Sequence, residues 1–330
     1  MAWKVLVTAR AFWSSGPEAY EQLLNAGCEV VKSDPLGPLT VEQLIPRLEG
    51  CDAVIASSDA YTPAVFAACP QLKIVSRWGV GIDSVDMAAA TEAGVVGTNT
   101  PGAMTEAVAD YTFGLMLSIA RRIPEGEALV RSGGWGEFPG VLVYGKTIGL
   151  VGAGMIGQAV ARRAAGFGMR ILAFDPPRQA SPTPDMPAME FVTLEALYAE
   201  SDFVCIHVPN LPETKGMFDA KVFAQMKPTA FLINTARGAL VNEVDLLAAL
   251  ESGQIAGAAI DVFANEPLPV DHPLRKAPRS VLTPHNAFNA FESTQTMSQM
   301  AVDNVLTLMR GERPVGICNP DVWDSPARRA

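Results

Sequence analysis

Short apolar runs rich in β-branched residues alternate along the chain with longer stretches of helical periodicity. Near the start, the apolar run 4–8 (KVLVT) precedes a helical pattern at 17–26, and another apolar run follows at 29–31. Strands that alternate with helices favour a parallel sheet with helices on both faces. Residues 1–100 are therefore expected to form an α/β domain.

Helix boundaries in this region carry their own signals. Thr40 and Gln43 have the spacing of a capping box at a helix start. Gly27, Gly50 and Gly94 stand where helices are expected to stop. The boundary signals and the hydrophobic pattern therefore agree.

A second series of alternating runs begins at residue 147. Its apolar runs, again separated by helical patterns, predict a doubly wound sheet of the nucleotide-binding type. The predicted strands are 147–151 (TIGLV), 171–174, 203–208, 231–234, 258–262 and 281–283.

Two further helices are expected to connect the two halves. Residues 103–120 predict a helix that joins them, and residues 290–310 predict one that returns to the first half. The predicted fold class is α/β, with two doubly wound parallel-sheet domains. A Rossmann-type domain at 101–288 is expected to be inserted into a flavodoxin-like domain made of 1–100 and 289–330.

Two segments lack regular periodicity. Five prolines between residues 176 and 187 predict a loop after a strand. Residues 121–144 combine glycines and aromatics in a way that suits an arm lying on another surface. A partner subunit is one candidate for that surface, so a homodimer is expected.

Composition and charge narrow the classes of partner. With 49% hydrophobic and 18% charged residues, the 330-residue chain is expected to be a well-packed globular protein. A formal net charge of −10 disfavours broad binding to nucleic acid or acidic membranes, because both are anionic. The apolar stretch 111–120 is far shorter than the roughly 20 residues that span a bilayer.

Cysteine usage and the N-terminus suggest a compartment. The five cysteines are scattered, without C-x-x-C spacing for a metal or redox site, and the first residues show no secretory pattern. Reduced thiols, no metal and a cytoplasmic location are therefore expected.

A glycine-rich turn follows the first strand of the second half. Gly152, Gly154 and Gly157 form G-x-G-x-x-G between TIGLV and the helical pattern MIGQAVARRAAGF, with Met155 and Ile156 inside the motif. The first glycine permits a tight turn, the second lets the backbone approach a pyrophosphate, and the third lets the helix pack on the strand. The helix N-terminus would add N–H groups and partial positive charge for the phosphates.

An acid ends the next predicted strand. Asp175 follows RILAF, where a carboxylate accepts hydrogen bonds from the adenosine ribose and repels the 2′-phosphate of NADP. The motif and this acid together predict NAD as the cofactor. The alternative is a purely structural turn in which Asp175 caps a loop, and the nearby Arg178 leaves room for NADP.

Candidates for acid–base chemistry are few. The chain has three histidines, His207, His272 and His285, and an imidazole titrates close to neutral pH. His285 follows the strand pattern VLTP, while Arg237 and Asp261 follow two other predicted strands. Ligands of doubly wound sheets bind beyond the carboxyl ends of the strands, so these three side chains are expected near the cofactor.

Seven motifs in order make the chain resemble the D-isomer-specific 2-hydroxyacid dehydrogenases over residues 50–310. Within that family the resemblance is to the D-3-phosphoglycerate dehydrogenase branch without a C-terminal regulatory domain. The motifs are RWGVGIDSVD (77–86), NTPGAMTEAVAD (99–110), GLVGAGMIG (149–157), HVPNLPET (207–214), INTARG (233–238), DVFANEP (261–267) and TPH (283–285).

The resemblance implies an NAD-dependent enzyme acting on a small anionic 2-hydroxy or 2-keto acid. His285 would exchange a proton with the C2 oxygen while hydride moves between C2 and the nicotinamide. Glu266 would hydrogen-bond the imidazole and favour its protonated form. Arg237 would hold the substrate carboxylate and polarise the C2 oxygen. Taken singly, each could instead be an ordinary exposed or backbone-bonded residue.

The resemblance also implies contacts from other motifs. The substrate is expected to meet Arg237, His285 and the turn made of Arg77, Trp78, Gly79, Val80 and Gly81, although that turn could be only a glycine turn. Expected cofactor contacts are Thr105, Gly152, Gly154, Met155, Ile156, Gly157, Asp175, His207, Pro209, Thr214, Thr235, Ala236, Arg237, Asp261 and His285. Thr105 is also expected to cap its helix, and Asp261 has the alternative of a buried acid bonded to backbone. His272 is expected to be structural.

Two aromatic residues depart from the phosphoglycerate branch. Phe288 and Trp78 are bulkier than the residues usual at their positions, and both would narrow the substrate pocket. Phosphoglycerate is therefore doubtful as the substrate. An NAD(H)-sensing, corepressor-like binding protein on the same fold is the main alternative, and turnover of simple keto acids would discriminate the two. A methyltransferase would leave Arg237, Glu266 and His285 without a role.

Overall fold

The computed structural model describes residues 2–178 and 186–329. The chain forms two compact units: unit 1 comprises Met1–Met104 and Asn289–Ala330, and unit 2 comprises Thr105–Phe288. Unit 1 is therefore discontinuous in sequence. Within the described part of the chain, no helix is long and apolar enough to cross a membrane.

Unit 1 is built on a parallel sheet with the strand order β2-β1-β3-β4-β5, the flavodoxin-like order. Its strands are β1 (Lys4–Val7), β2 (Glu29–Lys32), β3 (Ala53–Ala56), β4 (Ile74–Arg77) and β5 (Val96–Thr98). Its helices are α1 (Phe12–Ser15), α2 (Pro17–Asn25), α3 (Val41–Leu48), α4 (Pro63–Ala68), α5 (Met87–Glu92) and α12 (Phe291–Met309), followed by the short 3-10 turn η3 (Pro320–Val322).

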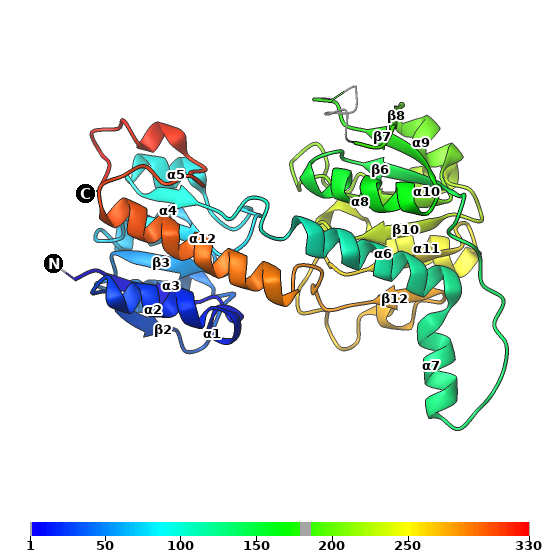
Figure 1. Ribbon diagram of the computed structural model, residues 1–330, viewed down its shortest axis with the longest axis horizontal. Coiled ribbons are helices and arrows are strands. Elements are labelled where there is room, and N and C mark those ends of the chain that lie inside the picture. Colours follow the sequence, from blue (N-terminus) through cyan, green and yellow to red (C-terminus); the bar gives the residue numbers. More distant parts are fainter. Residues whose placement is uncertain (1, 179–185, 330) are drawn as a thin grey trace. The chain divides into compact units, whose positions relative to one another are not determined.

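Helices cover both faces of this sheet (Figure 1). The α3 and α4 side is filled by buried apolar residues such as Leu44, Val65 and Phe66. On the other side, α12 packs on β4 and against α2, and the Ser76 hydroxyl donates to Ala301 O at 2.9 Å. One face of the unit 1 sheet is thus covered in part by α12, a helix that follows the whole of unit 2 in the sequence.

Unit 2 contains a second parallel sheet with its own set of helices. Its strands are β6 (Thr147–Val151), β7 (Arg170–Phe174), β8 (Glu190–Phe191), β9 (Phe203–Ile206), β10 (Phe231–Asn234), β11 (Gly257–Ile260) and β12 (Ser280–Leu282). Its helices are α6 (Thr105–Arg121), α7 (Ile123–Arg131), α8 (Met155–Gly166), α9 (Leu194–Glu200), α10 (Ala220–Gln225) and α11 (Glu243–Ser252), with the 3-10 turns η1 (Gly238–Leu240) and η2 (Pro273–Lys276).

The strand order of this sheet is β12-β11-β10-β9-β6-β7-β8. The chain runs outward from β6 in one direction and from β9 in the other, so the order reverses between these two neighbours. Such a reversal opens a crevice beyond the carboxyl ends of the strands, which is where doubly wound folds bind nucleotides. β6 and β9 are almost wholly buried, as expected for central parallel strands.

Two apolar cores lie on the two faces of the unit 2 sheet. One packs α6 and α8 onto the sheet, through residues such as Phe113 and Val160. The other packs α9, α10 and α11 onto the opposite face, through residues such as Leu197, Phe223 and Leu246. These cores fix the strand ends that carry the candidate site.

The predicted fold class is confirmed, since both sheets are parallel and covered by helices. One local expectation was wrong, and two elements were not predicted. The two-residue strand β8 was not expected, and part of the arm at 121–144 is the helix α7. The joining helix begins at Thr105, so this residue lies in the first turn rather than capping it. Of the proline-rich loop, residues 179–185 lie outside the described residues.

Candidate active site

The glycine turn after β6 is shaped by close backbone contacts. Gly152 has a φ of +102°, and a Cβ there would lie 2.6 Å from His207 O. A Cβ on Gly157 would lie 2.2 Å from Gly152 O. A Cβ on Gly154 would meet no atom within 4 Å, although this residue caps α8. Two glycines are thus required by the fold, while the middle one leaves open space at a helix N-terminus.

Asp175 lies beside this turn, at the end of β7. Its Oδ2 accepts a hydrogen bond from Ala153 N at 2.9 Å and an ion-paired hydrogen bond from Arg178 Nη1 at 3.1 Å. The carboxylate therefore couples the glycine turn to the loop after β7. Arg178 is held close to the acid that was predicted to select NAD.

His207, at the end of β9, contacts the glycine turn through its backbone. Its ring atom Nε2 is buried and has no hydrogen-bond partner within the described protein. Burial lowers the pKa of His207 to about 4, so the ring is neutral near pH 7. A buried polar atom without a partner beside an open helix N-terminus fits a bound polar group such as a dinucleotide.

The loop after His207 is braced from within. Thr214 Oγ1 donates to Pro209 O at 2.7 Å and accepts from Leu211 N at 2.8 Å. Thr214 therefore shapes the loop, while Pro209 is exposed on it.

The turn after β10 presents Arg237. Asn234, at the strand end, accepts a hydrogen bond from Ala236 N at 3.0 Å and donates to Arg237 O at 2.9 Å. Thr235 is buried, with its hydroxyl 3.1 Å from that of Thr112 on α6. Sequence reasoning missed Asn234, although an Asn at the end of a strand is a frequent turn-former.

Glu266 and His285 form the central pair of the site. Nδ1 of His285 and Oε2 of Glu266 are 2.6 Å apart, and Glu266 Oε1 accepts from Phe263 N at 2.9 Å. Burial alone would raise the pKa of Glu266, but the contacts with His285 and Phe263 and the charge of Arg237 outweigh it and lower this pKa. An ionised Glu266 keeps a proton on Nδ1, so Nε2 is the ring atom left for acid–base chemistry.

Asp261 holds the turn that carries the histidine. This fully buried acid accepts from Thr283 Oγ1 at 2.6 Å and from the amides of Asn286 and Ala287, each at 2.9 Å. His285 N donates to Asp261 O at 2.7 Å, and His285 adopts a left-handed φ of +53°. These contacts favour the second interpretation of Asp261, a buried acid at a strand end that is hydrogen-bonded to the backbone.

The predicted substrate turn belongs to unit 1. Gly79 has a φ of +140°, and its amide donates to Thr100 Oγ1 at 3.1 Å. The Trp78 indole is buried and donates to Ser298 Oγ at 2.9 Å. The Trp78 side chain thus packs in the interior of unit 1, and a substrate contact would use its backbone.

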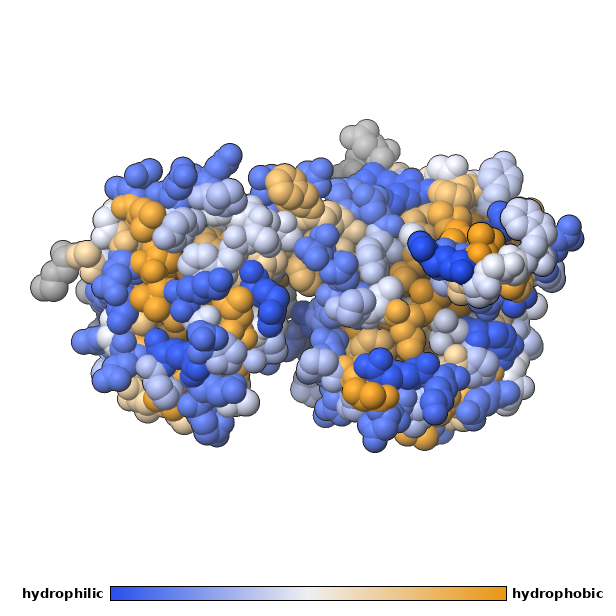
Figure 2. All heavy atoms as spheres, turned by 90° about the horizontal axis from the view of Figure 1, so that it is seen from below, coloured by the Kyte–Doolittle hydropathy of each residue, from blue (hydrophilic) through white to orange (hydrophobic). Residues whose placement is uncertain are grey.

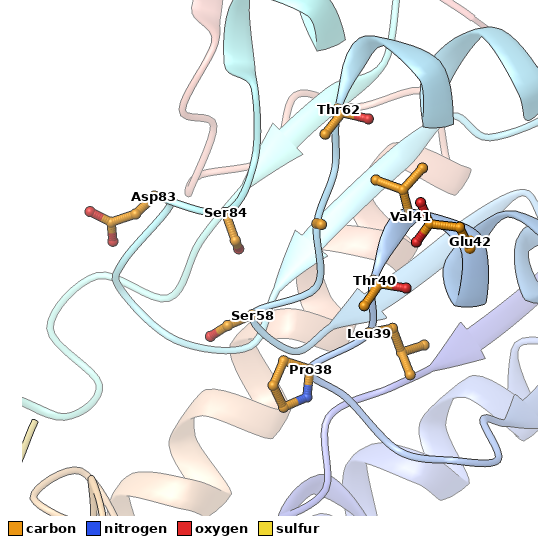
Figure 3. A pocket seen from close by; sticks show the side chains of 10 residues that line it. Pro38, Leu39, Thr40, Val41, Glu42, Ser58, Thr62, Asp83 and Ser84 are labelled. Atoms are coloured by element: carbon orange, nitrogen blue, oxygen red, sulfur yellow. The ribbon is translucent and has the colours of Figure 1, made fainter. Parts of the chain in front are cut away.

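An open hollow of about 640 Å³ also lies in unit 1 (Figure 3). Its lining includes Thr40, Ser58, Asp83 and Ser84, but none of the residues predicted to bind the cofactor or to act in catalysis. Ser58 links the hollow to the predicted substrate turn, because its hydroxyl accepts from Arg77 Nη2 at 2.9 Å. Among the described residues, no group of three or more His, Cys, Asp or Glu could hold a metal.

Comparisons with known proteins identify the family of the chain. Residues 113–287 match the family model of the D-isomer specific 2-hydroxyacid dehydrogenase, NAD binding domain. The glyoxylate reductase of Korarchaeum cryptofilum is 43% identical over 292 residues, covering 86% of this chain and 88% of the relative. That of Thermofilum pendens is 40% identical over 314 residues, covering 93% of each.

Solved structures are similar over nearly the whole chain. The TT0316 protein of Thermus thermophilus has a TM-score of 0.87 at 38% identity, covering 96% of this chain and 99% of that one. An NADPH-dependent glyoxylate/hydroxypyruvate reductase of Sinorhizobium meliloti, in complex with NADP and malonate, has a TM-score of 0.83 at 30% identity, covering all of both chains.

The doubly wound sheet of unit 2 and the matched NAD-binding domain define an NAD-dependent dehydrogenase. The chain belongs to the D-isomer-specific 2-hydroxyacid dehydrogenase family. It is an oxidoreductase that transfers hydride between the nicotinamide and C2 of a small 2-hydroxy or 2-keto acid. The two relatives above are glyoxylate reductases, so the phosphoglycerate branch gains no specific support.

Gly154→Ala should weaken cofactor binding without destabilising the fold. The added methyl group meets no protein atom within 4 Å, but it enters the space that a pyrophosphate would use. We expect NADH affinity, measured by calorimetry, to fall at least about tenfold with the melting temperature unchanged. Gly166→Ala, also open and at the other end of α8, is the control and should bind NADH normally. Equal NADH affinity in both variants would contradict the assignment.

The neutral state of His207 should make stability depend on pH. The folded pKa of about 4 lies below the unfolded value, so the unfolded chain takes up the proton first as pH falls. Stability should decline from about pH 6.5 towards pH 4, by as much as roughly 3 kcal/mol from this residue. Urea unfolding of the wild type and of His207→Asn at a series of pH values in this range measures the free energy of unfolding of each. A wild-type slope no steeper than that of the variant would refute the prediction.

Proposed function

We propose that the enzyme is an NADH-dependent reductase of glyoxylate or a similarly small 2-keto acid. The observation that carries the proposal is the 2.6 Å hydrogen bond between Glu266 and His285 on the strand-end turn. The similarity to glyoxylate reductases over most of the chain supports the substrate class.

In this proposal each catalytic residue has one task. His285, protonated, donates a proton from Nε2 to the C2 oxygen, and Glu266 stabilises the imidazolium before the transfer. Arg237 binds the substrate carboxylate and draws negative charge towards the C2 oxygen. When bound, NADH supplies the hydride to C2. The keto acid thus gains one hydride and one proton to become the 2-hydroxy acid.

For the cofactor, Asp175 is proposed to bind the adenosine ribose, and its charge disfavours a 2′-phosphate. Ion pairing with Arg178 weakens that repulsion, so we expect a preference for NADH over NADPH rather than strict exclusion. Thr105, Pro209, Thr214, Thr235 and Ala236 are proposed as further contacts along the cofactor. Asp261 is proposed to act by holding the His285 turn.

For the substrate, the turn at 77–81 in unit 1 is proposed to offer backbone amides to the carboxylate. Unit 1 would then be the substrate domain and unit 2 the cofactor domain. In unit 2, the ring of Phe288 meets that of His285 edge to face, with centroids 6.2 Å apart. An apolar wall beside the proton donor favours small, unphosphorylated substrates.

We further propose a cytoplasmic homodimer built on the arm at 121–144. Every residue of α7 is at least partly exposed, and Val130, Trp135 and Leu142 are 57%, 91% and 63% exposed. Within the arm, the Arg122 guanidinium lies 4.9 Å from the Phe138 ring centroid. α7 projects from unit 2, and the view towards it shows apolar residues beside charged ones (Figures 1 and 2). The exposed apolar side chains of this arm suit burial against a second copy.

Keto-acid reduction should depend on the central pair. We expect wild-type enzyme to oxidise NADH with glyoxylate, and less well with pyruvate, hydroxypyruvate, phenylpyruvate or 3-phosphohydroxypyruvate. His285→Ala should lose at least about a thousandfold in kcat and Glu266→Gln at least about tenfold, because proton donation and its support are removed. Absorbance of NADH during steady-state turnover measures this.

NADH binding, measured separately by calorimetry, serves as the control. Both variants should still bind NADH, because the glycine turn and Asp175 are unaltered. Undiminished turnover in His285→Ala would refute the assigned role. Tight NADH binding by a wild type that reduces none of these acids would favour the cofactor-sensing binding protein instead.

The double variant Val130→Asp, Leu142→Asp should be monomeric. Two charges on the arm would have to be buried without partners in a dimer. Light scattering should give twice 35.0 kDa for the wild type and 35.0 kDa for the variant. Val315→Asp, which alters a residue 96% exposed elsewhere, should remain dimeric. A monomeric wild type would disprove the homodimer.

A further inference from the structure

Unit 2 contains a second histidine–carboxylate pair that the proposed reaction does not use. His272 Nε2 and Glu243 Oε2 are 3.4 Å apart, and their side chains are 23% and 14% exposed. Glu243 is the first residue of α11, where the helix N-terminus stabilises a negative charge. Burying a carboxylate costs free energy unless both of its oxygens have hydrogen-bond or ionic partners.

The other oxygen of Glu243 holds the loop that carries Glu266. Glu243 Oε1 accepts from Ala264 N at 2.8 Å. The preceding amide, of Phe263, donates to Glu266 Oε1 at 2.9 Å. Two successive amides therefore bind two different carboxylates, and one of those carboxylates contacts His285.

The same stretch of backbone also touches the turn of Arg237. A Cβ on Gly238 would lie 1.9 Å from the carbonyl carbon of Phe263 and 2.4 Å from Ala264 N. The peptide between Phe263 and Ala264 is thus packed against the residue that follows Arg237. Fixing this peptide fixes the backbone near both Arg237 and Glu266.

The hydrogen bonds of His272 define which way its ring faces. Nδ1 accepts from Leu274 N at 3.4 Å, at the start of η2. An acceptor at Nδ1 leaves the proton of a neutral ring on Nε2, which faces Glu243. His272 can therefore donate to Glu243 without being charged.

We propose that Glu243 and His272 are positioning residues for catalysis. Glu243 fixes the Phe263–Ala264 peptide, and so holds Phe263 from its carboxyl side. The N–H of Phe263, in the adjoining peptide, orients Glu266, and Glu266 orients the imidazole of His285. His272 holds Glu243 in the rotamer that reaches Ala264. The inference rests on the proposed function, because Glu266 and His285 must be the catalytic pair for the brace to affect turnover.

The test compares acids two residues apart on α11. Asp245 also lies in the first turn and also accepts a backbone amide, that of Ala220 at 3.0 Å, but Ala220 begins another helix. Glu243→Ala should lower kcat for glyoxylate at least about tenfold, with KM and NADH affinity changed less than about twofold. Asp245→Ala should keep the wild-type kcat, although its melting temperature should fall by about as much as that of Glu243→Ala. Glu243→Gln, which retains an acceptor for Ala264 N, should recover most of the turnover, and His272→Gln should fall between the two.

Imidazole nitrogen NMR gives a readout that needs no turnover. With three histidines in the chain, the His285 signals can be assigned by substitution. They should move in Glu243→Ala, because the hydrogen bond to Glu266 loosens, and stay in place in Asp245→Ala. Unmoved His285 signals together with a kcat equal to that of Asp245→Ala would overturn the brace. If the wild type reduces no keto acid, the proposed function fails, and the His285 signals still decide whether Glu243 positions the ring.

Discussion

The site depends on one constraint, the left-handed turn at His285. A non-glycine residue at a φ of +53° is strained and persists only where its surroundings enforce it. Asp261 does so with three hydrogen bonds from the residues around the histidine and a fourth contact through its own carbonyl. The buried carboxylate is stabilised by these donors, and in return the imidazole is presented at one fixed angle to Glu266.

Unit 1 uses the same device for a different loop. Asp59, fully buried just beyond β3, accepts hydrogen bonds from the Thr8 hydroxyl and from Leu39 N. Burial raises the pKa of Asp59, although these donors and the charge of Arg77 act in the opposite direction. In both units, then, a buried aspartate beyond an inner strand binds loop groups at the carboxyl edge of the sheet. Polar contacts therefore help to order both loops.

The sequence predicted what short-range patterns determine. Apolar runs located the buried strands to within one or two residues, because a central parallel strand is apolar on both faces. The spacing of Gly152, Gly154 and Gly157 located the turn. The strand β8 was missed, since two residues carry no periodicity, and α7 was missed because no face of it is buried in its own unit. Glu243 was missed for a different reason: its partners, Ala264 and His272, are remote in sequence, and only the folded loop brings them together.

The insertion of unit 2 into unit 1 sets an order of events during synthesis. The five strands of unit 1 leave the ribosome first, but α12, which covers β4, follows only after the whole of unit 2. At typical translation rates, roughly 190 intervening residues take on the order of 10–40 s. During that interval the first sheet lacks α12 on one of its faces, while unit 2, continuous in sequence, is synthesised without interruption. The packing of unit 1 therefore stays incomplete until after the last residue of unit 2 has been synthesised.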